Sequence, residues 1–115
     1  MLQQKPDLDR LFHALADPTR RAIVERLAAG PAAASDLAQP MAMTLTAVMQ
    51  HLGVLEESRL IKTRKDGRRR ICSLDEFGVM AIEDWIAHRR AQWEQRFDRL
   101  GDVLARAKNS KGEKP

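Results

Sequence analysis

The 115-residue sequence contains no tyrosine, two tryptophans and three phenylalanines, so aromatic residues make up 4% of the chain. Proteins that hold single strands of nucleic acid stack the bases on aromatic side chains, and this composition argues against such a platform. The single cysteine, Cys72, excludes an internal disulfide framework and a cysteine-rich metal site. Apolar runs are too short to span a membrane, and charged residues near the start argue against a signal peptide. We therefore expect a cytoplasmic protein with no membrane partner.

Residue sets that perform catalysis are missing as well. The sequence shows no nucleophile with a matching base, no glycine-rich loop for phosphates, and no His/Asp/Glu cluster at metal-ligand spacing. His13, His51 and His88 fall on three separate predicted helices. We expect no enzymatic activity, no cofactor and no metal site.

The net charge of +4 is unevenly distributed along the chain. Residues 59–70 hold seven basic residues and one acidic residue, whereas residues 1–58 are slightly acidic and residues 71–115 are balanced. A solvated charged face usually mixes the two signs. A basic excess confined to one short segment indicates contact with a polyanion.

The segment before this basic stretch, Thr44–Leu55, predicts a helix that can pack against a hydrophobic core. Thr44 suits the N-cap position, because its hydroxyl can accept a free backbone N–H of the first turn. At 3.6 residues per turn the large apolar residues gather on one face. These are Val48, Leu52 and Leu55, with Leu45 at the edge.

The opposite face of this helix carries short, uncharged side chains. Thr46 and Gln50 point outward, with Ala47, Met49 and Gly53 beside them. A face without Glu or Lys for two turns can lie against the floor of a DNA groove, although an ordinary amphipathic helix explains the pattern equally well. A glutamine amide can pair with adenine N6 and N7, and a threonine can donate to a base or touch a thymine methyl.

The elements before this helix complete a helix-turn-helix pattern. Pro6-Asp7 predicts the start of a first helix. Asp17-Pro18 predicts the start of a second helix, which Gly30-Pro31 ends. Ser35 is expected to cap a short third helix over residues 36–39, and residues 40–43 form the turn before Thr44. Residues 1–5 are expected to be a loose end.

After residue 59 the periodicity changes from helix to strand. Leu60–Lys65 and Arg68–Leu74 read as two strands, and Asp66-Gly67 between them is a strong signal for a hairpin turn. Such a two-stranded hairpin with a basic tip is called a wing. Successive strand residues face opposite sides, so the three consecutive arginines cannot all point at DNA. We expect Lys65 and two of these three arginines to contact phosphates or the minor groove.

Asp75 or Ser73 can cap a last, long helix that carries an apolar stripe nearly six turns long. The stripe could pack along its own domain, but pairing with the same helix or the first helix of a second copy fits its length better. The domain is expected to span residues 1–108, with a disordered tail over residues 109–115. The predicted dimer contacts are Leu11, Ile86, Trp93, Phe97, Leu100 and Leu104.

Four polar residues have structural alternatives that we favour over a functional role. His51 lies at the edge of the buried helix face, where a packed side chain competes with a DNA contact. Arg20 and Arg21 follow Asp17 within one turn and are expected to pair with acidic residues. Cys72 between Ile71 and Ser73 is expected to be a small buried hydrophobe, since a redox sensor needs an exposed thiol of low pKa.

The runs LFHALADPTRRAIVERLAAGP and SDLAQPMAMTLTAVMQHLGVLEESRLIKTRKDGRRRICSL resemble the ArsR-type winged-helix repressors, over about Leu11 to Leu74. The last helix, with EDWIAHRRAQWEQRFDRL, looks like the branch of that family that does not sense metals. The resemblance implies a mainly α winged helix-turn-helix fold with a two-stranded β wing and a long C-terminal dimerisation helix. It also implies a homodimeric transcription factor, usually a repressor, that binds double-stranded DNA at an imperfect inverted repeat.

The sequence departs from the family pattern at several positions. The segment ASDLAQ lacks the cysteine pair of many metal sensors, and the last helix has only His88 where other sensors have paired acidic and histidine ligands. Met49 stands where members often have serine, and Gly53 stands where they often have lysine. Detailed base preferences therefore cannot be carried over.

Two alternatives remain beside this interpretation. The chain could be a protein–protein module that uses the last helix and binds an acidic partner through the hairpin. It could also be a repressor released by a small apolar effector held at the dimer interface, which the stripe with Trp85 and Trp93 permits. The operator, the effector, the regulated genes and the sign of regulation cannot be read from the sequence. The predicted DNA contacts are Thr44, Thr46, Ala47, Met49, Gln50, His51, Arg64, Lys65, Arg68, Arg69 and Arg70.

Overall fold

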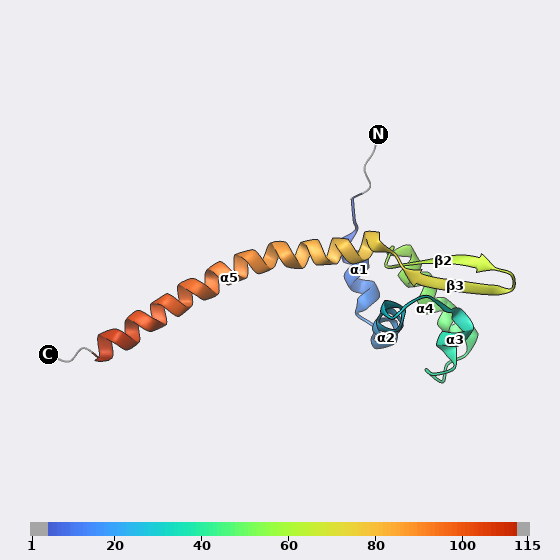
Figure 1. The fold of residues 1–115 in the computed structure, drawn as a ribbon, viewed down its shortest axis with the longest axis horizontal. Coiled ribbons are helices and arrows are strands. Elements are labelled where there is room, and N and C mark those ends of the chain that lie inside the picture. The colour runs from blue at the N-terminus through green and yellow to red at the C-terminus, as the bar shows by residue number, and fades with distance from the viewer. Residues whose placement is uncertain (1–4, 113–115) are drawn as a thin grey trace. The chain divides into compact units, whose positions relative to one another are not determined.

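The computed structural model describes residues 5–112 (Figure 1). The first two helices each begin after an aspartate. Asp7 precedes α1 (Leu8–Leu15) and Asp17 precedes α2 (Pro18–Ala28). Each carboxylate accepts the backbone N–H three residues further on, at 3.1 Å and 3.0 Å. These bonds satisfy N–H groups that a first helical turn leaves without partners. Both predicted helix starts are confirmed, and most of the predicted loose end lies outside the described residues.

The segment after α2 differs from the sequence prediction in two ways. Ala32–Ala33 forms a strand, β1, that the sequence pattern did not indicate. Helix α3 (Ala34–Ala38) then follows with Ala33 as its N-cap, so Ser35 lies inside the helix and does not cap it. Two alanines carry no strand signal of their own. This strand forms because a neighbouring sheet edge offers free backbone groups to pair with.

Helix α4 (Leu45–Glu57) is seated on the core as the sequence predicted. The hydroxyl of Thr44 accepts the Ala47 backbone N–H at 3.1 Å, so this residue caps the helix. A DNA contact by Thr44 stays a prediction. The inward side chains are at most 2% exposed: Val48, Leu52 and Leu55.

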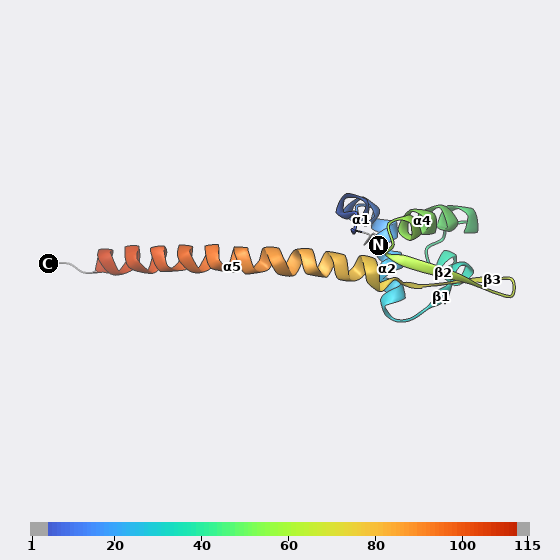
Figure 2. The same cartoon turned by 90° about the horizontal axis from the view of Figure 1, so that it is seen from above.

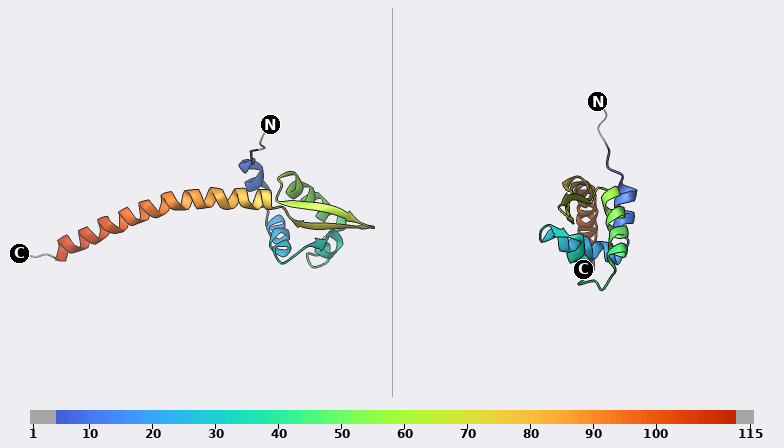
Figure 3. Two further views of the ribbon diagram at one scale, coloured as in Figure 1. Left: turned by 45° about the horizontal axis from the view of Figure 1, so that its top comes forward. Right: turned by 90° about the vertical axis from the view of Figure 1, so that its right-hand side faces the viewer.

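The three strands form one antiparallel sheet in the order β1-β3-β2 (Figure 2). β2 (Ile61–Asp66) and β3 (Arg69–Leu74) make the predicted hairpin, which we call the wing. Its register pairs the last residue of β2 with the first of β3, which leaves Gly67 and Arg68 as the turn. Gly67 has a φ of 63°, a left-handed conformation that costs glycine little. The wing tip extends past α3 and α4 (Figure 3).

The core of residues 5–82 lies between the helices and one face of the sheet. Leu11 of α1 is 1% exposed in this core, which corrects its prediction as a dimer contact. An apolar stripe on a short helix does not reveal which of its members face a partner; Phe12, the next residue, is 39% exposed. The largest buried side chains are Leu11, Ile23, Leu37, Val48, Leu55, Leu60, Ile61 and Cys72.

Helix α5 (Glu76–Gly112) follows Asp75, whose Oδ1 accepts the Phe77 backbone N–H at 3.0 Å. The helix ends four residues beyond Lys108, where the sequence predicted its end. Once a helix has formed, each further residue adds a hydrogen bond at little entropic cost, so weak helix formers can extend it. The predicted disordered tail is thus helical over residues 109–112, and residues 113–115 lie outside the described range.

Residues up to Ile82 form one compact unit, and α5 from Glu83 onward forms a second. The predicted single domain over residues 1–108 stays a prediction. Among the described helices, none combines the length and apolarity needed to cross a membrane.

Candidate DNA-binding surface

The outer face of α4 exposes the side chains that the sequence assigned to base reading. Thr46 and Gln50 are exposed, Met49 is 36% exposed, and Ala47 is half-buried. The helix carries no acidic residue before Glu56, close to its C-terminal end. A polyanion approaching this face therefore meets no carboxylate over the first turns.

His51 packs within the protein, as the favoured alternative stated. Its Nδ1 lies 3.5 Å from Arg20 Nη1 and 3.9 Å from Asp17 Oδ2, and its side chain is 23% exposed. The backbone N–H of Arg20 lowers the pKa of Asp17 most, and the charges of Arg20 and His51 lower it further. With these partners inside the chain, His51 is left out of the DNA surface proposed below.

The side chains of Arg20 and Arg21 donate to backbone carbonyls, and the charge of Arg20 also lowers the pKa of the acidic residue Asp17. Arg20 Nε donates to the Ala14 carbonyl at 2.7 Å, and Arg21 Nη1 donates to the Leu15 carbonyl at 2.7 Å. Both carbonyls belong to the end of α1, where a helix leaves such groups without intrahelical partners. An acidic partner, as predicted, is therefore present for Arg20, whereas Arg21 donates to a main-chain oxygen.

Two of the wing arginines form ion pairs. Arg69 Nη2 lies 2.7 Å from Asp36 Oδ2, a carboxylate on α3. Arg64 Nη1 lies 3.9 Å from Asp66 Oδ2 within β2. All four side chains are more than half exposed, so water screens these pairs and each contributes little to stability.

A third wing arginine takes part in a chain of hydrogen bonds that reaches α4. Arg70 Nη1 donates to Thr63 Oγ1 at 2.8 Å, and Thr63 Oγ1 donates to Glu56 Oε2 at 2.5 Å. The chain joins β3, β2 and the C-terminal end of α4. It fixes the base of the wing relative to the helix proposed to read DNA.

Lys65 and Arg68 make no hydrogen bond or ion pair with any residue in the described part of the chain, and both are exposed. Lys65 ends the basic run of β2, and Arg68 lies in the wing turn. These two cations can therefore meet phosphates without first giving up an internal partner. The sequence treated the three consecutive arginines alike, and the structure separates Arg68 from Arg69 and Arg70.

Three residues of this surface were missed by the sequence analysis: Asp36, Glu56 and Thr63. Their partners lie 33 and seven residues away along the chain. Each pair of partners joins two different helices or strands, so the period of a single helix or strand does not relate their positions. No local signal could therefore have identified them.

The structure also bears on redox chemistry and metal binding. Cys72 is fully buried, as predicted, and burial raises the pKa of its thiol. A protonated, buried thiol is a poor redox sensor. Among the described residues, no group of three or more His, Cys, Asp or Glu side chains is placed to hold a metal ion.

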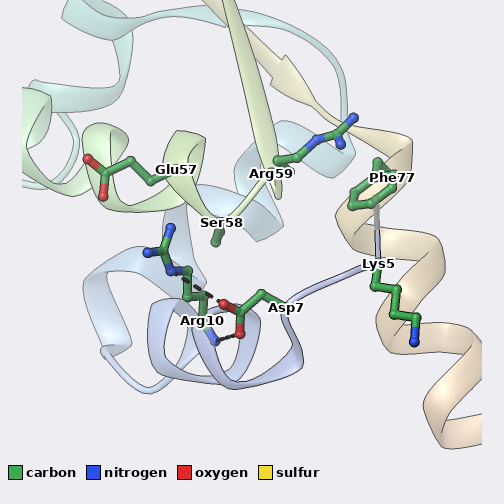
Figure 4. Close-up of a pocket in the computed structure, with 7 residues that line it drawn as sticks. All are labelled: Lys5, Asp7, Arg10, Glu57, Ser58, Arg59 and Phe77. Atoms are coloured by element: carbon green, nitrogen blue, oxygen red, sulfur yellow. Dashed lines mark hydrogen bonds and ion pairs between the residues drawn. The ribbon is translucent and has the colours of Figure 1, made fainter. Parts of the chain in front are cut away.

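A pocket of about 300 Å³ lies where α1, the end of α4 and the start of α5 meet (Figure 4). The guanidinium of Arg59 lies 3.6 Å from the centre of the Phe77 ring, and Asp7 pairs with Arg10 at 3.4 Å. The lining includes three basic and two acidic side chains, so the pocket has no strong preference for one charge. It is lined by Lys5, Asp7, Arg10, Glu57, Ser58, Arg59 and Phe77.

The second unit, α5 from Glu83, exposes a row of large apolar side chains. Phe97 is 68% exposed and Leu100 is 53% exposed. Exposed apolar surface of this extent usually marks an interface. The other exposed members are Ile86, Trp93, Val103 and Leu104.

Known proteins resemble both the sequence and this geometry. A sequence profile described as a helix-turn-helix domain matches residues 15–64. The HTH-type transcriptional regulator Rv2034 of Mycobacterium tuberculosis is 51% identical over 74 residues, which are 64% of this chain and 69% of the relative. The crystal structure of the ArsR family transcriptional regulator RHA00566 is 45% identical, with a TM-score of 0.70, and the match covers 82% of this chain and 97% of that one. This chain belongs to the ArsR family of transcriptional regulators.

A further ArsR-type relative is the transcriptional repressor SmtB homolog of Synechocystis, 37% identical over 86 residues, or 75% of this chain and 65% of the relative. The ArsR-family winged helix-turn-helix fold predicted from the sequence is confirmed. The protein is a DNA-binding transcriptional regulator, and the residues that match the helix-turn-helix profile include α2, α3 and α4.

Proposed function

We propose that this ArsR-family protein is a homodimeric repressor that sets one α4 from each subunit into the major groove of an inverted-repeat operator. The observation that carries the proposal is a shared groove. The uncharged face of α4, through Leu45 and Met49, and the arginines of the wing border the same depression of about 300 Å³. A duplex that lies across this depression would contact the outer face of α4 and Arg68 of the wing together.

The two elements are proposed to divide recognition between them. Gln50 and Thr46 contact base edges, because they are exposed on a helix face without charge. Lys65 and Arg68 contact phosphates, because they are cations without an internal partner in the described chain. Arg64, Arg69 and Arg70 already have partners within the chain, so they contribute less to phosphate binding.

Dimerisation is proposed to use the exposed apolar row of α5. A twofold dimer presents the same patch from both subunits and so buries the row on each. The twofold axis then relates the two copies of α4, which matches them to successive major grooves about 34–36 Å apart. Trp93, Phe97 and Leu100 are the proposed centre of the contact.

Repression is supported by the names of two relatives. The SmtB homolog of Synechocystis and SdpR of Bacillus subtilis, the second 27% identical, are both transcriptional repressors. A dimer bound over a promoter blocks polymerase access. A reporter with the selected operator between the promoter elements should be transcribed less when the protein is expressed, and increased transcription would reject the repressor role.

The experiment that tests the proposal is selection of binding sites from a random duplex library, followed by footprinting. We expect an imperfect inverted repeat whose half-sites lie one helical turn apart. The sites selected by the Gln50→Ala variant should lose their base preference at one position of each half-site. Selection of a single, asymmetric site, or of none, would contradict the proposal.

A further inference from the structure

Two apolar side chains on the outer half of α4 are exposed to solvent, whereas the large apolar side chains on its inner face are buried. Leu45 is 51% exposed and Met49 is 36% exposed. They are four residues apart, so they lie one above the other on the helix side that faces the wing. Both border the groove of about 300 Å³, whose lining residues are Ala34, Ser35, Leu45, Met49, Arg68, Arg69 and Arg70.

The residues around Leu45 and Met49 indicate which kind of molecule binds over them. Three arginines of the wing line the same groove, and of these only Arg69 forms an ion pair among the described residues, so the groove favours an occupant with negative charge beside an apolar surface. A second apolar helix would place its own surface against three guanidinium groups. Duplex DNA satisfies both requirements, because phosphates flank a major groove whose floor includes one apolar group, the 5-methyl of thymine.

We propose that Leu45 and Met49 read thymine by burying its 5-methyl group, so that the operator contains at least one thymine per half-site recognised through this methyl. The proposal rests on the proposed placement of α4 in the major groove. Leu45 is the first residue of α4, and N-terminal residues of a recognition helix are those that reach base edges. Neither side chain can donate a hydrogen bond, so the contact is apolar.

The expected size of the effect follows from the area of a methyl group. Burying one such group changes affinity about fourfold, which is about 0.8 kcal/mol. Uracil differs from thymine only in lacking the 5-methyl, and it keeps the same base pair and the same hydrogen-bonding edges. Replacing thymine with uracil therefore isolates the contact from every other term in recognition.

The experiment uses the full chain and the duplex obtained by selection, with each thymine replaced by uracil in turn. The measured quantity is the ratio of dissociation constants for the uracil and thymine duplexes. For the wild-type protein we expect a ratio of about four at one or two positions per half-site and about one elsewhere. In Leu45→Ala and Met49→Gln, the ratio at the corresponding position should fall towards one.

Two controls separate this contact from general effects. Met80→Ala removes a side chain that is 54% exposed on another helix and should leave every ratio unchanged. Gln50→Ala should weaken operator binding while keeping the uracil ratio, because it acts on a different base. Circular dichroism of each variant checks that the fold is retained.

The outcomes distinguish this inference from the function on which it rests. Selection that yields no preferred duplex overturns both. A preferred duplex that binds equally well with uracil at every position overturns only the thymine contact. A uracil effect that persists unchanged in both Leu45→Ala and Met49→Gln also overturns it, since another residue then reads the methyl.

Discussion

The backbone N–H of Gly78 donates to the carbonyl of Arg59 at 3.0 Å, and a Cβ at position 78 would collide with that carbonyl. Arg59 has a φ of 67°, so it ends α4 in the left-handed conformation that usually belongs to glycine. The Leu60 N–H bonds back to the Leu55 carbonyl at 3.0 Å, which completes this helix end. The last turn of the recognition helix is thereby joined to the first turn of α5.

This close approach predicts that Gly78→Ala is destabilising. The added methyl meets main-chain atoms, which cannot rotate away, so we expect a decrease of about 1–3 kcal/mol in the free energy of unfolding. Urea denaturation measures it. Gly53→Ala is the matched control, because a Cβ there meets nothing within 4 Å and alanine favours a helix. Equal stability of the two variants would show that the junction tolerates a side chain.

The lowered pKa of Asp17 predicts a pH-dependent contribution to stability. A carboxyl whose pKa is lower in the folded protein stabilises the fold above its ordinary pKa, and the effect is lost as the pH falls through the lowered value. Asp17→Asn keeps an oxygen that can cap α2 but removes the charge. The variant should therefore unfold more readily than the wild type at neutral pH, and the difference should vanish in acid. A difference in thermal unfolding that is constant with pH would contradict this.

The Asp36–Arg69 pair predicts that removing an acidic side chain strengthens DNA binding. Asp36→Asn frees the Arg69 guanidinium, which can then meet a phosphate. Binding to scrambled DNA should tighten, and the dependence of log affinity on log salt should steepen by up to about 0.9. Glu25→Gln removes the same charge from an exposed residue of α2 and should leave the slope unchanged. An unchanged slope in Asp36→Asn would mean that Arg69 stays away from DNA.

The apolar row of α5 predicts a dimer that should dissociate when charged residues replace the apolar side chains at its centre. Trp93→Glu combined with Leu100→Glu should give monomers in sedimentation and abolish operator binding, since each half-site alone binds weakly. The control, Ala91→Glu with Gln95→Glu, adds the same two charges to the other side of the helix and should remain dimeric. A folded Trp93→Glu/Leu100→Glu protein that stays dimeric would reject this interface.

Local signals in the sequence predicted most of the fold. Asp17-Pro18 identifies a helix start from the chemistry of two adjacent residues, and the spacing of Val48, Leu52 and Leu55 identifies the buried face of α4. Contacts between distant segments could not be predicted in this way. Strand β1 exists only where β3 pairs with it, and the partner of Arg69 lies on another helix.

The same limit applies to the candidate site. The outer face of α4 follows from helical periodicity, so Thr46 and Gln50 could be placed outside in advance. Asp36 and Thr63 are the partners of Arg69 and Arg70, so they determine which wing arginines have a partner within the chain. Their positions are known only from the folded structure. The sequence therefore located the surface, and the structure separated the wing cations that have partners within the chain from those that have none among the described residues.

The central claim is that α4 reads bases while the wing neutralises phosphates. Titrations of wild type, Gln50→Ala and Arg68→Ala, on selected and scrambled duplexes at several salt concentrations, separate the two roles. Arg68→Ala should weaken both kinds of binding and lower the salt slope by about 0.9 for each phosphate that the variant no longer neutralises. Gln95→Ala, a glutamine on α5 outside the apolar row, is the control for removal of an amide.

Gln50→Ala on the selected duplex is the most direct measurement. We expect it to reduce discrimination between selected and scrambled DNA by about 1–3 kcal/mol, with the salt slope and scrambled binding nearly unchanged. If Gln50→Ala instead weakens selected and scrambled binding equally, α4 is not the element that reads the operator.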